Sequence, residues 1–237
     1  MLAKTKGIVL KNTNYRESSI ISKMYTREFG LRTYILQSIK KGKSIIKPSM
    51  VQPLSIVEMD VYEKPNAGIN RLKELKNTPL LLNLQDDIVK KSVAMFYIEV
   101  LNKCVMEEHY ETELFDFIEQ EIINLNDKPV YSYQPIDFLL KLTPFLGVQP
   151  QGKYSDNTPY FNFEEGVFAN QSGNSPVSKE VSKLISLILN KANLNEVDVK
   201  SANLRKQCLN VVLDYYQIHV IKNREIKSIE ILSELLH

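Results

Sequence analysis

The first third of the chain alternates apolar and polar residues with a period of two. In the run LSIVEMDVYEK the apolar side chains Val57, Met59 and Val61 are separated by the acids Glu58 and Asp60. This spacing is typical of a strand with one buried face. Four other β-rich runs lie between residues 4 and 78, namely KGIVLKN, SSIISKMYTREFG, LRTYILQSI and INRLKEL. Five short strands in about 75 residues predict a small closed barrel, for which the OB-fold is the common solution.

After Pro79 the apolar residues recur at intervals of three and four, which predicts amphipathic helices. A short last helix is expected after Ser228, a plausible N-cap residue. Residues 147–176 are rich in Gly, Pro, Ser and Asn and predict an irregular loop region. The fold class is therefore α+β, with an OB-fold domain at 1–79 and an all-helical domain at 80–237. The main helices are expected near residues 93–105, 114–125, 135–142, 181–189 and 204–218.

Composition indicates a globular protein that stays inside the cell. A hydrophobic content of 43% over 237 residues is enough for a packed core. No run of about 18 apolar residues predicts a membrane span, and the lysines in MLAKTKGIVLK argue against a signal peptide. Cys104 and Cys208 lie in apolar helical patterns, which favours buried thiols in a reducing cytoplasm.

Charge is divided unevenly along the chain. Residues 1–50 hold eleven basic and two acidic residues, a net charge of +9, which leaves 19 basic and 26 acidic residues, or −7, for the rest. A basic segment of this kind favours a polyanionic partner. Tyrosines stand beside these basic residues. Single-strand binders typically combine aromatic rings, which stack on unpaired nucleobases, with cations, which contact phosphates.

The loop IKKGKSIIKP contains Gly42-Lys43-Ser44, which match the last three residues of a phosphate-binding P-loop motif. The first glycine of that motif is replaced by Gln37, and Pro48 follows too soon for a helix to begin at the serine. We therefore interpret the loop as a contact to a nucleic-acid backbone that acts by counterion release. The residues predicted to contact DNA are Lys4, Lys6, Lys11, Tyr15, Arg16, Lys23, Arg27, Arg32, Tyr34, Lys40, Lys41, Lys43 and Lys47.

No local pattern predicts catalysis, a cofactor or a metal site. The sequence lacks G-x-S-x-G, H-E-x-x-H and glycine-rich dinucleotide motifs. Neither Cys104 with His109 nor Cys208 with His219 has metal-ligand spacing. The protein is expected not to be an enzyme. Two alternatives stay open: an RNA-binding OB-fold module, and an enzyme whose site is assembled from distant residues.

Several segments resemble the RecO family of bacterial DNA-repair and recombination mediators. They are KGIVLKNTNYRESSIISKMYTREFGLRTYILQSIKKGKS, QPLSIVEMDVY, FLLKLTPFLGVQP and YFNFEEGVF. The resemblance implies binding of single- and double-stranded DNA, annealing of complementary strands, and help in loading RecA onto strands coated by single-stranded-DNA-binding protein. It also implies RecR and, in some bacteria, RecF as partners, a nucleoid-associated location in the cytoplasm, and no nucleotide cofactor.

The chain departs from this family at residues 147–176. Many RecO proteins carry four zinc-binding cysteines there, whereas this segment contains no cysteine or histidine. We therefore expect no zinc, and a loop that is either mobile or held by packing of its aromatic residues, Tyr160, Phe161, Phe163 and Phe168.

A partner site is also expected on the first long helix. The acidic, apolar C-terminal tail of single-stranded-DNA-binding protein needs an apolar groove with cations at its rim. The helix from Lys90 to Met106 offers both kinds of side chain. The residues predicted to bind this tail are Lys90, Lys91, Phe96, Tyr97, Val100 and Lys103.

Overall fold

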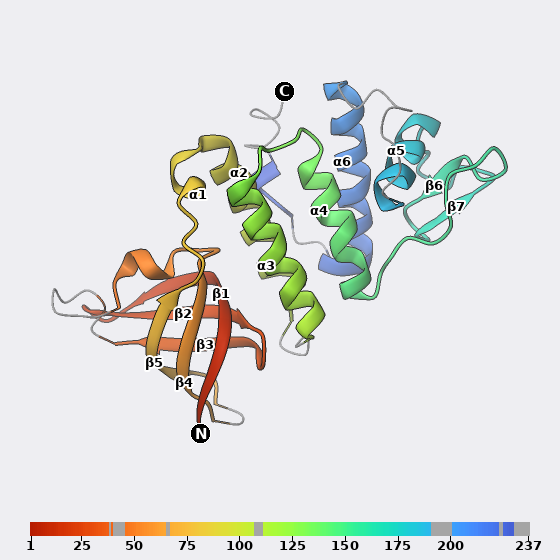
Figure 1. Ribbon diagram of the computed structural model, residues 1–237. Coiled ribbons are helices and arrows are strands. Elements are labelled where there is room, and N and C mark those ends of the chain that lie inside the picture. Colours follow the sequence, from red (N-terminus) through yellow and green to blue (C-terminus); the bar gives the residue numbers. More distant parts are fainter. Residues whose placement is uncertain are drawn as a thin grey trace. The chain divides into compact units, whose positions relative to one another are not determined.

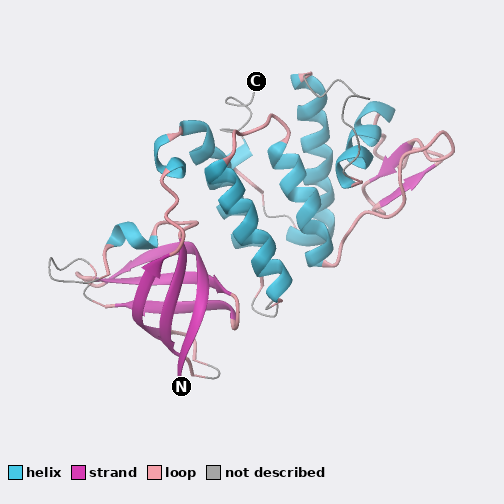
Figure 2. Ribbon diagram, in the orientation of Figure 1, coloured by secondary structure: helices cyan, strands magenta, loops and turns pink. Residues whose placement is uncertain are grey.

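The computed structural model describes residues 1–37, 39, 46–64, 67–106, 111–190, 201–222 and 225–229. The chain divides into two compact units, Met1–Lys128 and Pro129–His237. Within the described ranges, no helix combines the length and the apolar character needed to cross a membrane. Figures 1 and 2 show strands at the start of the chain and mainly helices after them.

The first unit begins with a closed barrel in the order β1-β2-β3-β5-β4. The predicted OB-type barrel within an α+β fold is confirmed. Neighbouring strands are antiparallel, except that β3 and β5 pair in parallel over two register positions, Tyr34 with Asn70 and Ile35 with Arg71. The strands are β1 Leu2–Tyr15, β2 Ser19–Thr26, β3 Gly30–Leu36, β4 Ile56–Tyr62 and β5 Asn70–Asn77, with a 3-10 turn η1 at Pro48–Val51.

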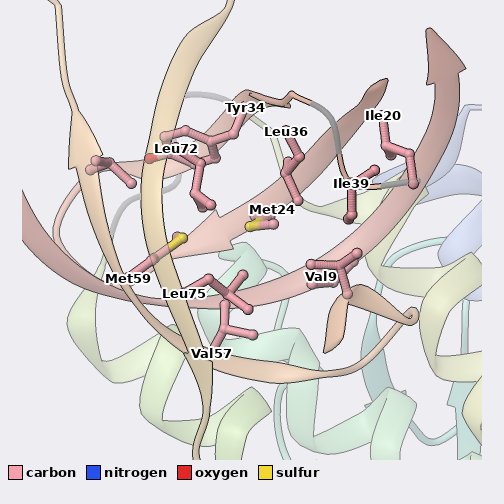
Figure 3. Packing of buried hydrophobic residues seen from close by; sticks show 12 residues of the cluster. Val9, Ile20, Met24, Tyr34, Leu36, Ile39, Val57, Met59, Leu72 and Leu75 are labelled. Carbon is pink, nitrogen blue, oxygen red and sulfur yellow. The ribbon is translucent and has the colours of Figure 1, made fainter. Parts of the chain in front are cut away.

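Alternation along each strand fills the barrel interior (Figure 3). On β4 the apolar residues Val57, Met59 and Val61 are buried and Glu58 is exposed, as the period of two predicts. Gly7 leaves room for the Met59 side chain, because a Cβ at this position would lie 2.5 Å from the Met59 methyl carbon. The same core contains Val9, Ile20, Met24, Tyr34, Leu36, Ile39, Val51, Leu72 and Leu75.

A β-bulge divides β1 into two halves. Val9 pairs with Met24 and Lys11 pairs with Lys23, so Leu10 is an additional residue on β1. Without it, strict alternation from Val9 would place Lys11 inside the barrel. The bulge instead buries Leu10 and leaves Lys11 exposed on the outer face.

Helices of the same unit cover the outer side of the barrel on one side of this bulge. Ile8, Leu10 and Tyr25 are fully buried, and we call them the covered face. Ile8 and Tyr25 are next to the core residues Val9 and Met24 in the chain, so alternation points them to the outside of the barrel. The Tyr25 ring lies 6.1 Å from the ring of Phe115, and the Asn102 amide donates to the Leu10 carbonyl at 3.0 Å. The helices of this unit are α1 Asn83–Asp86, α2 Ile88–Cys104 and α3 Thr112–Asp127.

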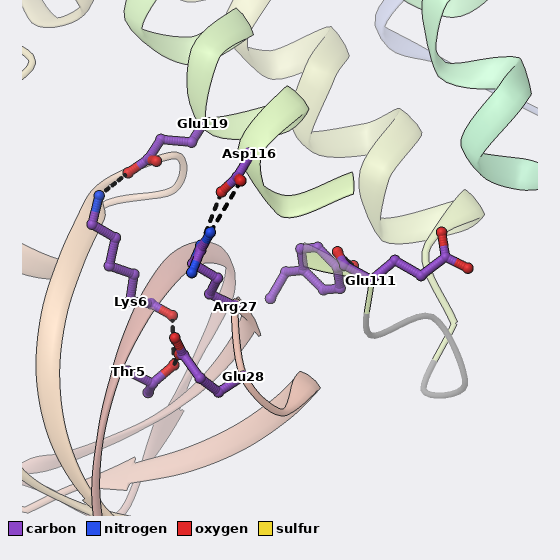
Figure 4. A network of polar contacts seen from close by, with 8 residues as sticks. Thr5, Lys6, Arg27, Glu28, Glu111, Asp116 and Glu119 are labelled. Carbon is purple, nitrogen blue, oxygen red and sulfur yellow. Dashed lines mark hydrogen bonds and ion pairs between the residues drawn. The ribbon is translucent and has the colours of Figure 1, made fainter. Parts of the chain in front are cut away.

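Ion pairs border the covered face (Figure 4). Lys6 contacts Glu119 at 2.9 Å. Arg27 donates two hydrogen bonds to Asp116, at 2.9 and 3.1 Å. The hydrogen bond from Arg27 holds the pKa of Asp116 below its usual range. Helix α3 therefore joins the barrel through both apolar packing and opposite charges.

The second unit is built around helices and a small aromatic hairpin. The Tyr215 ring lies 5.8 Å from Phe161, which lies 5.1 Å from Phe168, and Phe161 and Phe168 are buried. His219 contacts the Phe163 carbonyl at 3.0 Å. Aromatic packing therefore holds this hairpin against α6 and η4. The elements are α4 Gln134–Leu142, η2 Thr143–Leu146, β6 Tyr160–Asn162, β7 Val167–Ala169, α5 Lys179–Leu189, α6 Ala202–Tyr216 and the π-helical turn η4 Gln217–Ile221.

Both cysteines are buried free thiols, as their apolar surroundings in the sequence predict. Burial raises the pKa of Cys104 to about 12, and it also raises the pKa of Cys208. Neither thiol is therefore suited to act as a nucleophile near neutral pH. Most of the helix predicted after Ser228 lies outside the described residues.

Candidate nucleic-acid interface

We call the outer side of β1, β2 and β3 beyond the bulge the open face. Its residues are Lys11, Thr13, Ile21, Lys23, Thr33 and Ile35, and all of them are exposed or half-buried. Lys11 lies opposite Lys23, which lies opposite Thr33. Thr13 lies opposite Ile21, which lies opposite Ile35. The open face thus joins a basic row to a row with apolar surface.

The pairing of Lys11 with Lys23 is unfavourable unless an anion is bound. Two like charges directly opposite each other on a sheet repel. In the part of the chain that the structure describes, neither lysine forms an ion pair with a carboxylate. A phosphate between the two ammonium groups would remove the repulsion, so this pair is a candidate phosphate contact.

An exposed aromatic side chain stands at the end of the open face. Tyr15 closes the β1–β2 hairpin opposite Ser19 and is 37% exposed. Arg16 follows at a φ of 54°, an uncommon left-handed conformation for an arginine, and its guanidinium lies 5.2 Å from the Tyr15 ring centre. The hairpin end therefore presents a flat ring and a cation together, with Glu17 as the acid in the same turn.

Other predicted DNA contacts are occupied by acids of the same unit. Lys6 and Arg27 pair with Glu119 and Asp116, as described above, so they bind α3 in this structure. Lys4 is exposed but lies opposite Asp60 in the β1–β4 register. This side of the barrel is therefore close to charge balance, and it attracts a polyanion less than the open face does.

Tyr34 and Arg32 belong to a polar network at one end of the barrel interior. The Tyr34 hydroxyl donates to Glu63 at 2.6 Å, the Asn70 amide donates to the same carboxylate at 3.0 Å, and Arg32 lies 3.7 Å from it. Burial, followed by the hydrogen bond to Glu63, raises the pKa of Tyr34 far above its usual value. Because the Tyr34 ring is fully buried, it cannot stack on a nucleotide base in this conformation.

The structure describes only part of the basic loop IKKGKSIIKP. Lys40, Lys41 and Lys43 lie outside the described residues, so their predicted role stays a prediction. Lys47, at the start of η1, is exposed and forms no ion pair within the described ranges.

The residues predicted to bind a partner tail lie mostly in the core of the first unit. Phe96, Tyr97 and Val100 are fully buried, so they offer no groove to a peptide in this conformation. Lys90 is buried and donates to the Asn126 carbonyl. Lys103 contacts Glu99 at 2.6 Å, and Lys91 is exposed. Tail binding by this helix stays a prediction; of the six residues, Lys91 is exposed and Lys103 is half-buried.

Three residues of the outer surface were missed by sequence reasoning, namely Ile21, Ile35 and Arg71. Alternation within β2 and β3 was the signal that places the isoleucines outside, because Ile20, Met24 and Leu36 fill the interior. No sequence signal brings Arg71 to the same surface, because that depends on the parallel pairing of β3 with β5.

The second unit does not fit the zinc site that many RecO proteins carry. Residues 147–176 contain no cysteine or histidine to ligate the metal. Among the described residues, no group of three or more His, Cys, Asp or Glu side chains is arranged to hold a metal ion.

Known proteins similar to this chain cover nearly all of it. Two family models match: "Recombination protein O N terminal" over residues 1–78 and "Recombination protein O C terminal" over residues 85–228. Proteins named DNA repair protein RecO are similar over almost their whole length. The one from Flavobacterium johnsoniae is 30% identical over 236 residues, with 99% of each chain covered. Those from Azobacteroides pseudotrichonymphae and Christiangramia forsetii are 32% and 31% identical, with 98% and 99% of each chain covered.

Proposed function

Because the chain belongs to the RecO family, we propose that it is a DNA-binding recombination mediator that anneals complementary single strands and helps to load a recombinase during repair. The observation that carries this proposal is the open face. There the barrel presents Lys11 and Lys23 opposite each other without acidic partners in the described ranges, next to an exposed tyrosine.

The open face suits annealing for an electrostatic reason. Two complementary strands repel each other through their phosphates, and ammonium groups that neutralise phosphates lower that repulsion. Contacts to the backbone leave the base edges free to pair. The side chains involved supply positions and charge and transfer no atoms, so we propose a binding and annealing protein and not a catalyst.

The expected partners follow from the same family membership. We propose that the protein binds both single- and double-stranded DNA, acts with RecR and single-stranded-DNA-binding protein, and, where present, with RecF and RecA. An RNA-binding module is the competing assignment, and annealing of DNA strands against annealing of RNA strands separates the two.

The test is annealing of two complementary oligonucleotides without nucleotide or metal, across a salt series. The test variant is Lys11→Glu/Lys23→Glu. A matched control is Lys73→Glu/Lys76→Glu, which makes the same charge change on β5 at lysines that already pair with Glu74 and Glu58.

We expect the wild type and the control to anneal and the test variant to lose most of its activity. Loss of two phosphate contacts should flatten the slope of log affinity against log salt by about 1.4 for single strands. Equal loss in both variants would show that net charge alone matters and would remove the open face as the site. A third variant, Lys40→Glu/Lys41→Glu/Lys43→Glu, tests the basic loop IKKGKSIIKP separately.

A further inference from the structure

We infer that single-stranded DNA follows a track around the outside of the barrel that begins at Tyr15, crosses Ile21, Ile35 and Arg71, and ends at Tyr62. This inference rests on the proposed DNA-binding function and adds to it the path of the strand and the basis for preferring single strands.

Strand register places four of these residues, Ile21, Ile35, Arg71 and Tyr62, in one continuous outer row, and Thr13 is the β1 residue opposite Ile21. Ile21 lies opposite Ile35 across β2 and β3, and Ile35 lies opposite Arg71 across the parallel β3–β5 pair. Arg71 in turn lies opposite Tyr62 across β5 and β4. Each of these positions alternates with a buried residue, so each side chain points outward. The row therefore continues the open face across the parallel seam of the barrel.

Exposed aromatic rings lie near both ends of the row: Tyr62 ends it on β4, and Tyr15 lies two residues beyond Thr13 on β1. Tyr15 is 37% exposed and Tyr62 is 41% exposed. They are the exposed tyrosines in the part of the chain that the structure describes. Tyr25 and Tyr34 are buried instead, Tyr25 under α3 on the covered face and Tyr34 in the barrel core. Exposed rings near the two ends of one surface row are suited to stacking on bases, because every base has a flat face.

The charges along the row suit a nucleic-acid backbone. Arg16 stands beside the first ring and Arg71 beside the second, and Lys11 and Lys23 lie on the first two strands that the track crosses. Within the described ranges Arg71 forms no ion pair, in contrast to Lys6, Arg27 and Arg32. Cations therefore accompany the track over its whole length.

The length of the track indicates an unstacked strand. Four steps between neighbouring strands, at about 4.8 Å each, span about 19 Å. Four nucleotides, the lower end of the range for one OB-fold, would occupy roughly 5 Å each on this track. That spacing exceeds the 3.4 Å rise of a stacked duplex strand. Bases at this spacing are separated from one another and free to stack on the terminal tyrosines, whereas duplex bases are not.

The absence of tryptophan allows a direct test in the full-length protein. The variants Tyr15→Trp and Tyr62→Trp each introduce a single indole, whose fluorescence is quenched when a base stacks on it. Met95→Trp is the control, because Met95 is exposed on α2 of the same unit but away from the track. Each variant is titrated with an oligothymidine strand, with a duplex, and with a strand of the same length that lacks bases.

We expect the oligothymidine strand to quench the indoles at positions 15 and 62 and to leave the indole at position 95 unchanged. The duplex and the strand without bases should quench none of them. Tyr15→Ala and Tyr62→Ala should each weaken single-strand binding by about 5- to 150-fold, the range for loss of one stacking ring, and leave duplex binding unchanged.

Two kinds of failure are distinguishable. If the wild type binds DNA but the indole at position 62 is not quenched, or if the tyrosine variants lose duplex and single-strand binding equally, the track is overturned while the proposed function stands. If the wild type binds no DNA at all, the proposed function itself is overturned.

Discussion

Removal of α2 and α3 should strip the barrel of much of its stability, because the covered face depends on them. Ile8, Leu10 and Tyr25 are fully buried in the structure, and Tyr25 packs against Phe115 of α3. A fragment of residues 1–79 would expose these three side chains to water. Burial of each such side chain contributes about 1.5–3 kcal/mol, so the loss is about 5–9 kcal/mol as an upper limit.

This loss is comparable with the whole stability of a typical domain, about 5–15 kcal/mol. A fragment of residues 1–128, which keeps both helices and the Arg27–Asp116 ion pair, should remain folded. Urea unfolding followed by circular dichroism compares the two fragments, and binding of a dye specific for exposed apolar surface reports the uncovered face. A fragment 1–79 that is within about 1 kcal/mol of fragment 1–128 would refute the reasoning.

One substitution made in both fragments provides a control for this comparison. Leu10→Lys should improve the solubility of fragment 1–79, where position 10 faces water. The same change should destabilise fragment 1–128 and the full chain, where Leu10 is buried beside Asn102. Opposite effects in the two backgrounds would show that the helices, and not the barrel alone, set the environment of this residue.

Three other predictions concern individual groups. Glu63→Ala leaves the buried Tyr34 hydroxyl without its acceptor and should lower stability by about 1–3 kcal/mol in urea unfolding, and a change below about 0.5 kcal/mol would contradict the network. Burial raises the pKa of Tyr34, and it raises the pKa of Tyr215 to about 12. Tyrosines of the unfolded chain therefore ionise first, so the free energy of unfolding should hold below pH 10 and fall above it. A free energy of unfolding that is flat from pH 9 to 12 contradicts this. Gly166→Ala should lower the thermal midpoint, because φ is +72° and a Cβ would lie 3.2 Å from the Tyr215 ring, whereas Gly68→Ala, with open space around it, is the control that should change little.

Local pattern was enough to predict the elements and the fold class. Alternation identified the strands, and spacings of three and four identified the helices, because burial of one face imposes these periods on any sequence. The order of strands and helices then favoured a small barrel followed by helices, which the structure confirms. The boundary expected after residue 79 stays a prediction, and the compact unit of the structure extends to Lys128.

The candidate site was predictable only as a region. Charge placed the site in the first fifty residues, but it does not show which basic side chains are already paired with acids of the same chain. Lys6 and Arg27 meet acids that lie 113 and 89 residues away along the chain, and no local signal announces such pairs. Tyr15, Tyr25 and Tyr34 look alike in sequence, but one is exposed and two are buried.

The sequence by itself thus determined the strands, the helices and the basic character of the barrel, because these depend on residue type and on the nearest neighbours. The tertiary structure decided which side of the barrel is open. A single extra residue at Leu10 sends Lys11 outward, and the packing of α3 covers the half that begins at Ile8. The parallel pairing of β3 with β5 brings Arg71 beside Ile35. These outcomes depend on contacts between distant segments, which exist only once the chain has closed on itself.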